Sequence, residues 1–264
     1  MTQHFRRKHV FDGVRNFRDF GGYSAAGRHM VQGRFFRSAN HALASDADLA
    51  RMAEMGIGAI IDLRRPEERE RMPSRRWEGF KATVVENHDN HEGHGEESWN
   101  GFMDSWDLST EGVRSYHLRY YERAPVLPRL IDLYTQYFRA VAETEGPIVV
   151  HCAAGKDRTG IIVALTHALA GVHRDDIMED FLLTNDPAAF DVHGPIWAEE
   201  LAKTKGRAPS REAMHVTMGV HEDYLDRAFA VIEERYGSVE RYFREALGID
   251  TAQREKLERR LFET

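Results

Sequence analysis

The chain contains a single cysteine, Cys152, which stands where two apolar segments of different periodicity meet. Residues 148–150 are Ile, Val and Val after a Gly-Pro turn pair, a pattern typical of a short buried strand. From residue 161 onward apolar side chains recur at helical spacing, and Gly171 stands where the glycine that ends a helix is expected. The sequence therefore predicts a strand, a turn of small residues and a helix, with Cys152 at the start of the turn.

The turn, residues 152–159, reads Cys-Ala-Ala-Gly-Lys-Asp-Arg-Thr. Small residues that lead into a helix direct several backbone N–H groups at one spot, where the helix dipole adds partial positive charge. A phosphoryl group fits such a site, and Arg158 can bind two of its oxygens with its planar guanidinium. The same potential favours the thiolate of Cys152, and we expect the Thr159 hydroxyl to point at the sulfur. The turn therefore predicts a phosphate-binding loop that carries its own nucleophile.

The segment His-Cys-Ala-Ala-Gly-Lys-Asp-Arg-Thr-Gly, residues 151–160, resembles the signature loop of cysteine-dependent protein tyrosine phosphatases. Its Lys-Asp-Arg variant is similar to the bacterial atypical tyrosine and dual-specificity branch, whose members also act on phosphoinositides. Asn-Phe-Arg-Asp-Phe-Gly-Gly-Tyr at residues 16–23, Phe-Arg-Ser at 36–38 and Asp-Leu-Arg at 62–64 are similar to that branch too. The resemblance implies hydrolysis of phosphoric monoesters through a phosphocysteine intermediate, without a cofactor or a metal.

The resemblance also implies roles for individual residues. The catalytic residues are Cys152, Arg158 and Asp157. The phosphate-binding loop consists of Ala153, Ala154, Gly155, Lys156, Asp157, Arg158 and Thr159. Residues that support the site or bind substrate are Asn16, Arg37, Asp62, Arg64 and Asn185. The other arginines between residues 64 and 76 alternate with glutamates, and we expect most of them to form a solvated face.

The leaving oxygen needs a proton, and many tyrosine phosphatases take it from a separate Trp-Pro-Asp loop. This sequence has no such tripeptide, so Asp157 is the acid that the resemblance implies. Asp62 is an alternative, because it ends a buried strand where the family places an aspartate near the phosphate loop; a helix N-cap is its other reading. The remaining alternatives lie in the segment 87–112 and are Asp89, Asp104 and Asp107.

Lys156 bears on the substrate, because its cation beside the loop can meet a second phosphate. A lysine here resembles phosphoinositide phosphatases, but the lipid phosphatases also have a lysine directly after the cysteine, where this chain has Ala153. We therefore expect phosphotyrosine first, phosphoserine, phosphothreonine and phosphoinositides second, and phosphate or vanadate as active-site ligands. Two rival functions are an inositol phosphatase and a sulfurtransferase. The net charge of −7 disfavours the inositol phosphatase. The Thr159-Gly160 pair after the arginine and the lack of a tandem domain repeat disfavour the sulfurtransferase.

Composition adds loose bounds. The 264 residues are 42% hydrophobic and 30% charged, which is typical of a soluble globular chain, and we expect one phosphatase domain over residues 1–264. No apolar run approaches the roughly 18 residues of a membrane helix, and the first residues lack the apolar core of a secretory signal. One cysteine suits a reducing compartment, and the negative charge disfavours nucleic acid as a partner. These features favour a cytoplasmic protein. Export by a route that reads no N-terminal signal stays an alternative.

The predicted fold is α/β, with a central sheet of four or five largely parallel strands and helices on both faces. Strands are expected near residues 35–36, 57–61, 83–85 and 148–150, and helices near 45–54, 127–141, 175–183, 221–236, 238–247 and 251–262. Residues 87–112 read as an irregular insertion, whose aromatic residues pack it down or line the mouth of a pocket. Its histidines, His88, His91 and His94, lack the context of a metal site. Residues 187–220 read as a helical lid or cap.

Overall fold

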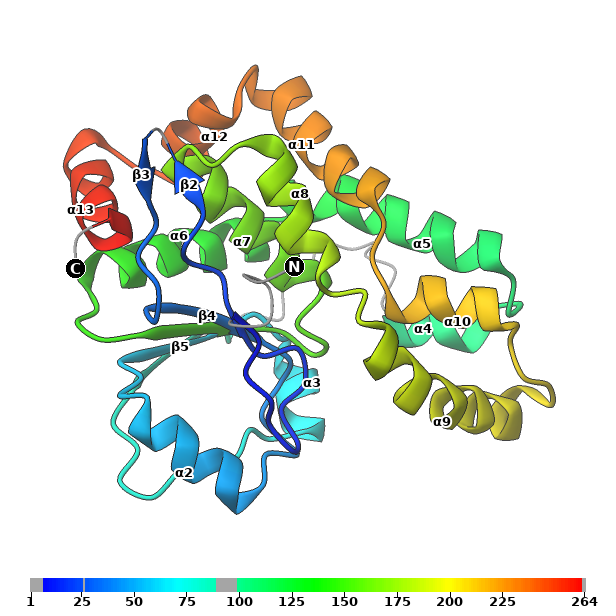
Figure 1. Ribbon diagram of the computed structural model, residues 1–264. Coiled ribbons are helices and arrows are strands. Elements are labelled where there is room, and N and C mark those ends of the chain that lie inside the picture. Colours follow the sequence, from blue (N-terminus) through cyan, green and yellow to red (C-terminus); the bar gives the residue numbers. More distant parts are fainter. Residues whose placement is uncertain (1–6, 26, 89–98, 263–264) are drawn as a thin grey trace.

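A five-stranded sheet runs through the centre of the computed structural model, which describes residues 7–25, 27–88 and 99–262 (Figure 1). The strand order is β1-β4-β7-β5-β6. The strands are Arg18–Asp19 (β1), Phe35–Ser38 (β4), Ala59–Asp62 (β5), Thr83–Glu86 (β6) and Ile148–His151 (β7). β4, β7, β5 and β6 are parallel, and β1 pairs with β4 in the antiparallel direction. The prediction of a largely parallel sheet is therefore confirmed. A separate hairpin pairs Ser24–Ala25 (β2) with Arg28–His29 (β3).

The register of the sheet brings three strand ends together. His151 at the end of β7 pairs with Ser38 of β4 on one side and with Asp62 of β5 on the other. The carboxyl ends of parallel strands are where open α/β sheets bind their ligands. Cys152 follows His151 directly, so the turn lies at this edge.

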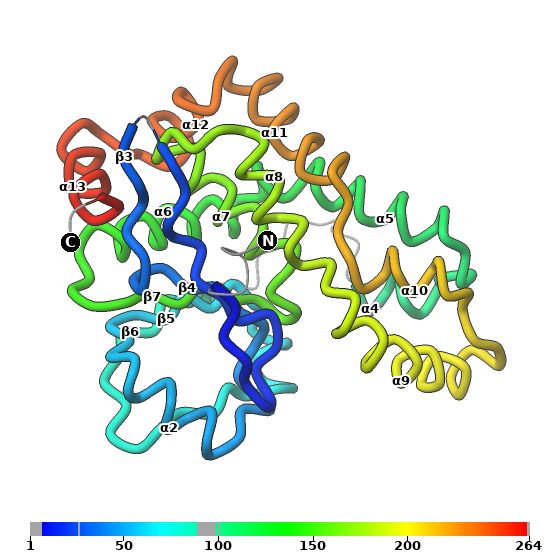
Figure 2. The backbone as a smooth tube through the Cα atoms, viewed as in Figure 1, coloured from blue at the N-terminus to red at the C-terminus, as the bar shows by residue number. Residues whose placement is uncertain are grey.

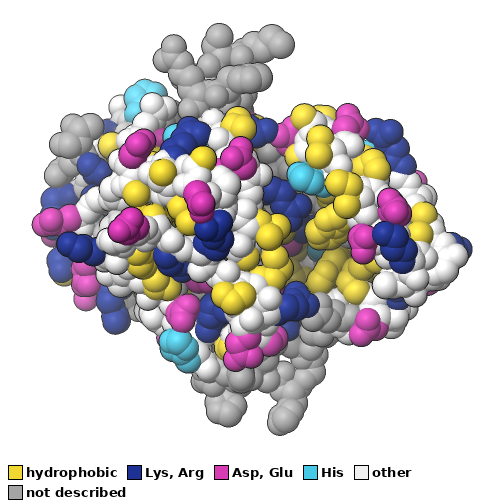
Figure 3. Space-filling model, turned by 90° about the horizontal axis from the view of Figure 1, so that it is seen from below, with side chains coloured by type: hydrophobic (Ala, Val, Ile, Leu, Met, Phe, Trp, Pro, Cys, Tyr) yellow, Lys and Arg dark blue, Asp and Glu magenta, His cyan; other side chains and the backbone are white. Residues whose placement is uncertain are grey.

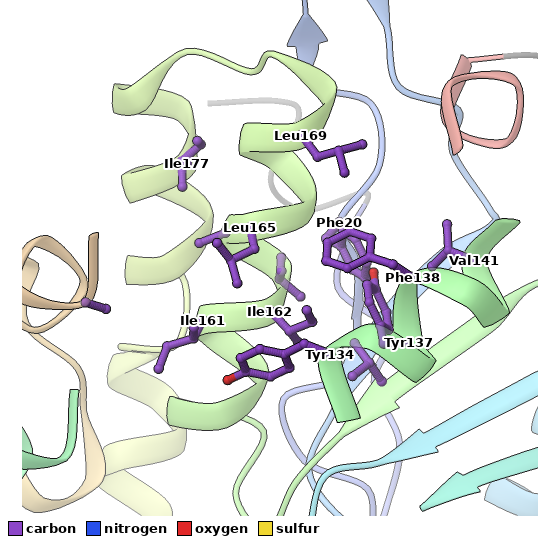
Figure 4. Packing of buried hydrophobic residues seen from close by; sticks show 14 of the residues in the cluster. Phe20, Tyr134, Tyr137, Phe138, Val141, Ile161, Ile162, Leu165, Leu169 and Ile177 are labelled. Carbon is purple, nitrogen blue, oxygen red and sulfur yellow. The ribbon is translucent and has the colours of Figure 1, made fainter. Parts of the chain in front are cut away.

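Helices cover both faces of the sheet, because its central strands are buried on both sides. One face packs on α6 (Pro128–Glu143) and α7 (Asp157–Ala170), where Ile162 lies beside Tyr134 and Tyr137 (Figure 4). The other face packs on α2 (Asp46–Glu54), and α3 (Pro66–Arg71) follows β5. Successive strand residues alternate between the two cores, since Val150 belongs to the first and Val149 to the second.

Four further helices form a lobe beside the sheet: α4 (Trp99–Ser105), α5 (Thr110–Arg123), α9 (Pro187–Lys205) and α10 (Arg211–Met218) (Figures 1 and 2). The prediction of an irregular segment at 87–112 is wrong for residues 99–105 and 110–112, which are helical. They are helical because Phe102 and Trp106 bury an apolar face against Tyr116 of α5 and Ala213 of α10. Residues 89–98, which include Asp89, His91 and His94, lie outside the described part of the chain.

The other elements follow the sequence pattern closely. They are a 3₁₀ turn at Ala124–Val126 (η1) and the helices Arg174–Leu182 (α8), Glu222–Tyr236 (α11), Val239–Glu245 (α12) and Thr251–Phe262 (α13). Helix α2 begins with a capping box, in which Ser45 and Asp48 each accept a hydrogen bond from the other's backbone N–H. Among the described residues, none of the helices has the length and apolar character that crossing a bilayer requires.

Candidate active site

The turn between β7 and α7 folds as a compact loop whose backbone is fixed by one glycine. Gly155 has φ of 69°, and a Cβ at this position would lie 2.3 Å from the backbone oxygen of Ser38. Only glycine tolerates both the left-handed backbone and this close approach. The loop is therefore pressed against the end of β4, and Cys152 at its start is buried with 2% of its surface exposed.

Side chains from outside the loop bind its carbonyl groups. Asn40 donates from its backbone N–H and from Nδ2 to the Ala153 oxygen, at 3.2 and 2.8 Å. The Gly155 oxygen accepts from Nδ2 of Asn16 at 2.8 Å and from Nη2 of Arg37 at 3.1 Å. These hydrogen bonds occupy two of the loop's carbonyl groups with donors from outside the loop. Asn16 and Arg37 thus contact the loop through one shared acceptor, the Gly155 oxygen.

Arg158 is clamped by a carboxylate on the neighbouring helix. Glu68 of α3 accepts from Nη1 at 2.5 Å and from Nη2 at 2.7 Å, and the Leu63 oxygen accepts from Nη1 at 3.2 Å. Burial lowers the pKa of Arg158, but the Glu68 charge and hydrogen bonds outweigh it and raise that pKa well above its ordinary value. Burial raises the pKa of Glu68, and the Arg158 charge and hydrogen bonds outweigh it and lower that pKa to about 2. The pair stays ionised until the pH falls towards that value.

This clamp determines which edge of the guanidinium is left for a ligand. Arginine has five N–H donors, and the contacts with Glu68 and Leu63 use both donors of Nη1 and one of Nη2. The remaining Nη2–H and the Nε–H share one edge of the planar group, and neither has a hydrogen-bond acceptor among the described residues. Two parallel donors on one edge match two oxygens of a phosphate.

Asp157, the first residue of α7, is contacted by the helical lobe. The Tyr121 hydroxyl of α5 donates to Oδ1 at 3.0 Å, and His117 Nδ1 lies 3.9 Å from the same oxygen. Lys156 Nζ lies 3.8 Å from Oδ2. The side chain of Asp157 is 20% exposed, so its carboxylate is not fully enclosed by these contacts.

Lys156 does not extend into solvent. Its ammonium donates to the carbonyl oxygens of Thr217 and Gly219 at the end of α10, at 2.8 and 3.0 Å, and lies 3.5 Å from His117 Nε2. Burial lowers the pKa of Lys156, while Asp157 and Cys152 raise it by a smaller amount. The ammonium is thus held by the lobe in this structure, which differs from the expectation that it meets a second phosphate.

Asp62 and Arg64 form a buried pair behind the nucleophile. Each is 1% exposed, and the Arg64 guanidinium contacts both Asp62 oxygens as well as the Met72 carbonyl and the Ser74 hydroxyl. Asp62 Oδ2 also lies 3.7 Å from His151 Nε2. Burial raises the pKa of Asp62, but His151 and Arg64 outweigh it and hold that pKa far below its usual range. A permanently ionised, buried carboxylate is unsuited to proton donation, and Arg64 has no exposed face for substrate.

The remaining predicted residues have separate surroundings. Asn185 exchanges two hydrogen bonds with the backbone of Val220, both at 2.8 Å, and so fixes the segment after α10. The buried Thr159 Oγ1 has no hydrogen-bond partner in the described chain, so its expected bond to sulfur is not formed. Asp107 accepts from Ser109 before α5, and Asp104 lies in α4. No group of three His, Cys, Asp or Glu side chains in the described ranges is arranged to hold a metal ion.

Three residues of this site do not follow from the sequence alone. Glu68 is hidden in a run of alternating charges, and its only local signal is its place three residues after Arg65, whose N–H it caps at 2.8 Å. His117 and Tyr121 lie on α5, which was not predicted. The spacing of Val113, Tyr116 and Tyr120 after the N-cap Ser109 is the signal that would have indicated this helix.

The space-filling view from below shows a hollow between the body of the sheet and the helical lobe (Figure 3). Hydrophobic side chains line much of it, with Lys or Arg side chains beside them. Two of the large exposed apolar residues, Val192 and Ile196, belong to α9 of this lobe. Lys156 joins the loop to the lobe, so the lobe stands next to the phosphate loop.

Comparison with known proteins agrees with this geometry. Residues 9–263 match the model of the tyrosine phosphatase family. A Cupriavidus necator protein named as a tyrosine-protein phosphatase is 34% identical over 250 residues, which cover 92% of this chain and 85% of that protein. The triple specificity protein phosphatase PtpB of Mycobacterium tuberculosis is 28% identical over 91% of this chain and 94% of its own length. A tyrosine-protein phosphatase of Nostoc commune is 25% identical over 86% and 74%. The chain therefore belongs to the tyrosine phosphatase family, as a protein-tyrosine phosphatase of the bacterial atypical type.

Proposed function

We propose that Cys152 is the nucleophile and that Arg158, the loop N–H groups and Asp157 complete the catalytic machinery. The observation that carries this proposal is the orientation of Arg158, whose clamp by Glu68 leaves two parallel N–H donors on one edge. A phosphate held by that edge and by the loop lies within reach of Cys152 at the loop's start. The thiolate attacks phosphorus, an S–P bond forms, and the bond to the leaving oxygen breaks.

Asp157 supplies the proton for the leaving oxygen and then accepts one from the water that hydrolyses the phosphocysteine. This assignment rests on the partial exposure of its side chain, because an acid must reach the leaving group, and on its place in the same loop as the nucleophile. Of the alternatives, Asp62 is buried and fixed by Arg64, and Asp104 and Asp107 lie in α4 and in the turn before α5. General acid catalysis of this kind contributes roughly 10²- to 10⁴-fold to the rate.

Replacing Asp157 by asparagine tests the acid. We expect kcat on an alkyl phosphate, such as a phosphoserine peptide, to fall by roughly 10²-fold or more, because its alkoxide cannot leave unprotonated. Turnover of p-nitrophenyl phosphate should fall much less, since nitrophenolate leaves without a proton. Equal losses on both substrates would assign the acid to another residue.

For the substrate we propose phosphotyrosine first and phosphoserine, phosphothreonine and phosphoinositides second. The relative from M. tuberculosis is named for triple specificity, which supports a site open to more than one phosphoester. The Lys156 ammonium is engaged by two carbonyls, so it is not free to bind the extra phosphate of an inositol headgroup. Inorganic phosphate and vanadate are expected to bind the loop and to inhibit competitively.

The order of substrates is measured by phosphate release. We expect kcat/KM on a phosphotyrosine peptide to exceed that on phosphatidylinositol monophosphates in vesicles by at least roughly 10-fold, the effect of losing one charged contact. Vanadate is the control for the shared site and should inhibit both reactions with one inhibition constant. A preference for the lipid would place phosphoinositides first.

A further inference from the structure

We infer that helix α5 positions the general acid: Tyr121 and His117 are directed at Oδ1 of Asp157, and Oδ2, which lies 3.8 Å from the Lys156 ammonium, is the oxygen that exchanges the proton. This inference rests on the proposed role of Asp157 and goes beyond it, because it assigns catalytic support to a helix outside the loop. Tyr121 and His117 are positioning residues in this account.

The contact of Tyr121 with Asp157 is the strongest part of the arrangement. Tyr121 has no exposed surface, and its hydroxyl donates to Asp157 Oδ1 at 3.0 Å. A buried phenol hydroxyl usually has a hydrogen-bond partner, and a hydrogen bond to a carboxylate is stronger than one between neutral groups. Burial raises the pKa of Tyr121 well above its ordinary value, and Asp157 raises it further, so the phenol keeps its proton. Tyr121 is therefore a permanent donor to one oxygen of the acid.

His117 adds a second polar group on the same side. It is 2% exposed, and burial, then the Lys156 charge, lower its pKa well below the ordinary value, so its ring is neutral. Lys156 can only donate, so Nε2 of His117, 3.5 Å away, accepts, and the ring proton is assigned to Nδ1. Nδ1 lies 3.9 Å from Asp157 Oδ1, which is longer than a hydrogen bond. The ring therefore directs its N–H dipole towards this oxygen without forming a hydrogen bond to it.

Lys156 fixes His117 in turn. Two of the three Lys156 donors are taken by the Thr217 and Gly219 carbonyls, and the third is directed at His117. The ring of His117 is further packed against Trp99 and Tyr224, with centroid distances of 5.8 and 5.3 Å. The acid is thus oriented by a chain of contacts that runs from the end of α10 through the loop to α5.

The chemical consequence concerns the carboxylate that forms during turnover. As the P–O bond breaks, the proton of Asp157 passes to the leaving oxygen and Asp157 becomes anionic. The Tyr121 donor and the Lys156 cation stabilise that anion, so they favour the transfer. When water attacks the phosphocysteine, the carboxylate takes its proton, the S–P bond breaks, and the cycle is restored with the thiolate released.

Tyr121→Phe tests the inference. We expect kcat on the phosphoserine peptide to fall roughly 10-fold or more, the loss of one hydrogen bond to a charged group, with p-nitrophenyl phosphate turnover changed by less than about 2-fold. Tyr137→Phe is the matched control, because it removes an equally buried hydroxyl that bonds Thr166 at 2.9 Å in the core. It should leave both rates unchanged.

The double variant Tyr121→Phe/Asp157→Asn separates this inference from the proposed function. If Tyr121 acts through the acid, the double variant should lose no more activity on the phosphoserine peptide, relative to p-nitrophenyl phosphate, than Asp157→Asn loses alone. Equal losses on both substrates in Tyr121→Phe, or an undiminished effect in the double variant, would overturn the positioning role. Equal losses in Asp157→Asn alone would instead overturn the assignment of the acid. Circular dichroism of each variant identifies any that fail to fold.

His117 is tested by two amide substitutions. His117→Asn keeps a donor near the position of Nδ1, so it should retain more activity on the phosphoserine peptide than His117→Gln does.

Discussion

Replacing Cys152 by serine is expected to lower kcat on p-nitrophenyl phosphate and on a phosphotyrosine peptide by roughly 10⁴- to 10⁶-fold. A serine hydroxyl at the same position stays protonated at neutral pH, and it attacks phosphorus far more slowly than the intrinsically more nucleophilic cysteine sulfur. Steady-state release of phosphate, measured for both substrates at one pH, checks the result. The two losses should be similar, because every substrate reacts through the same sulfur.

Phosphate binding distinguishes loss of the nucleophile from damage to the phosphate-binding loop in this experiment. The serine variant keeps the loop and Arg158, so inorganic phosphate should bind it within a few-fold of the wild-type affinity in a calorimetric titration. Loss of phosphate binding together with turnover would mean that the substitution distorts the loop. Turnover near the wild-type level would show that another residue attacks phosphorus.

Replacing Arg158 by lysine is expected to lower kcat on p-nitrophenyl phosphate by roughly 10²- to 10³-fold, the usual effect of removing a donor to developing charge. A lysine is one point charge, so it cannot contact Glu68 and also present two parallel donors to phosphate. The effect should be largest in kcat, because charge on the equatorial oxygens builds in the transition state. Competitive inhibition by vanadate should weaken in parallel, since vanadate binds the same donors.

The control for this substitution is Arg227→Lys, which alters an arginine that pairs with Glu122 and Glu234 on the surface. Surface pairs contribute little to stability, so this variant should keep its activity and melt near the wild-type temperature. An Arg158→Lys enzyme with undiminished kcat would show that the guanidinium does not hold the phosphate.

The elements that carry the nucleophile could be predicted from the sequence because their signals are local. The strand before Cys152, the small residues after it and the helix to Gly171 occupy one continuous stretch, and their order alone places a thiol at a helix N-terminus. The parallel sheet followed for a similar reason, since its buried strands are short apolar runs that end in turns. Asn16 and Arg37 were named through the resemblance, and the structure adds their shared acceptor, the Gly155 oxygen.

The parts that could not be predicted depend on contacts distant in sequence. Glu68 lies 90 positions before Arg158, and nothing in a run of alternating charges distinguishes it from its exposed neighbours. Helix α5 is rich in charged and polar residues, and it buries its apolar side only because α4, α10 and α11 pack against it. The direction of the Lys156 side chain was open for the same reason, since Thr217 and Gly219 supply its acceptors from another part of the chain.

The central claim is that the phosphoryl group passes through Cys152, and trapping the intermediate tests it most directly. The enzyme is mixed with an excess of phosphotyrosine peptide, denatured within milliseconds, digested and analysed by mass spectrometry. We predict one added phosphoryl group on the peptide that contains Cys152, and none in the same digest of Cys152→Ser. A phosphoryl group on any other residue, or wild-type turnover by an enzyme that lacks this sulfur, would contradict the account.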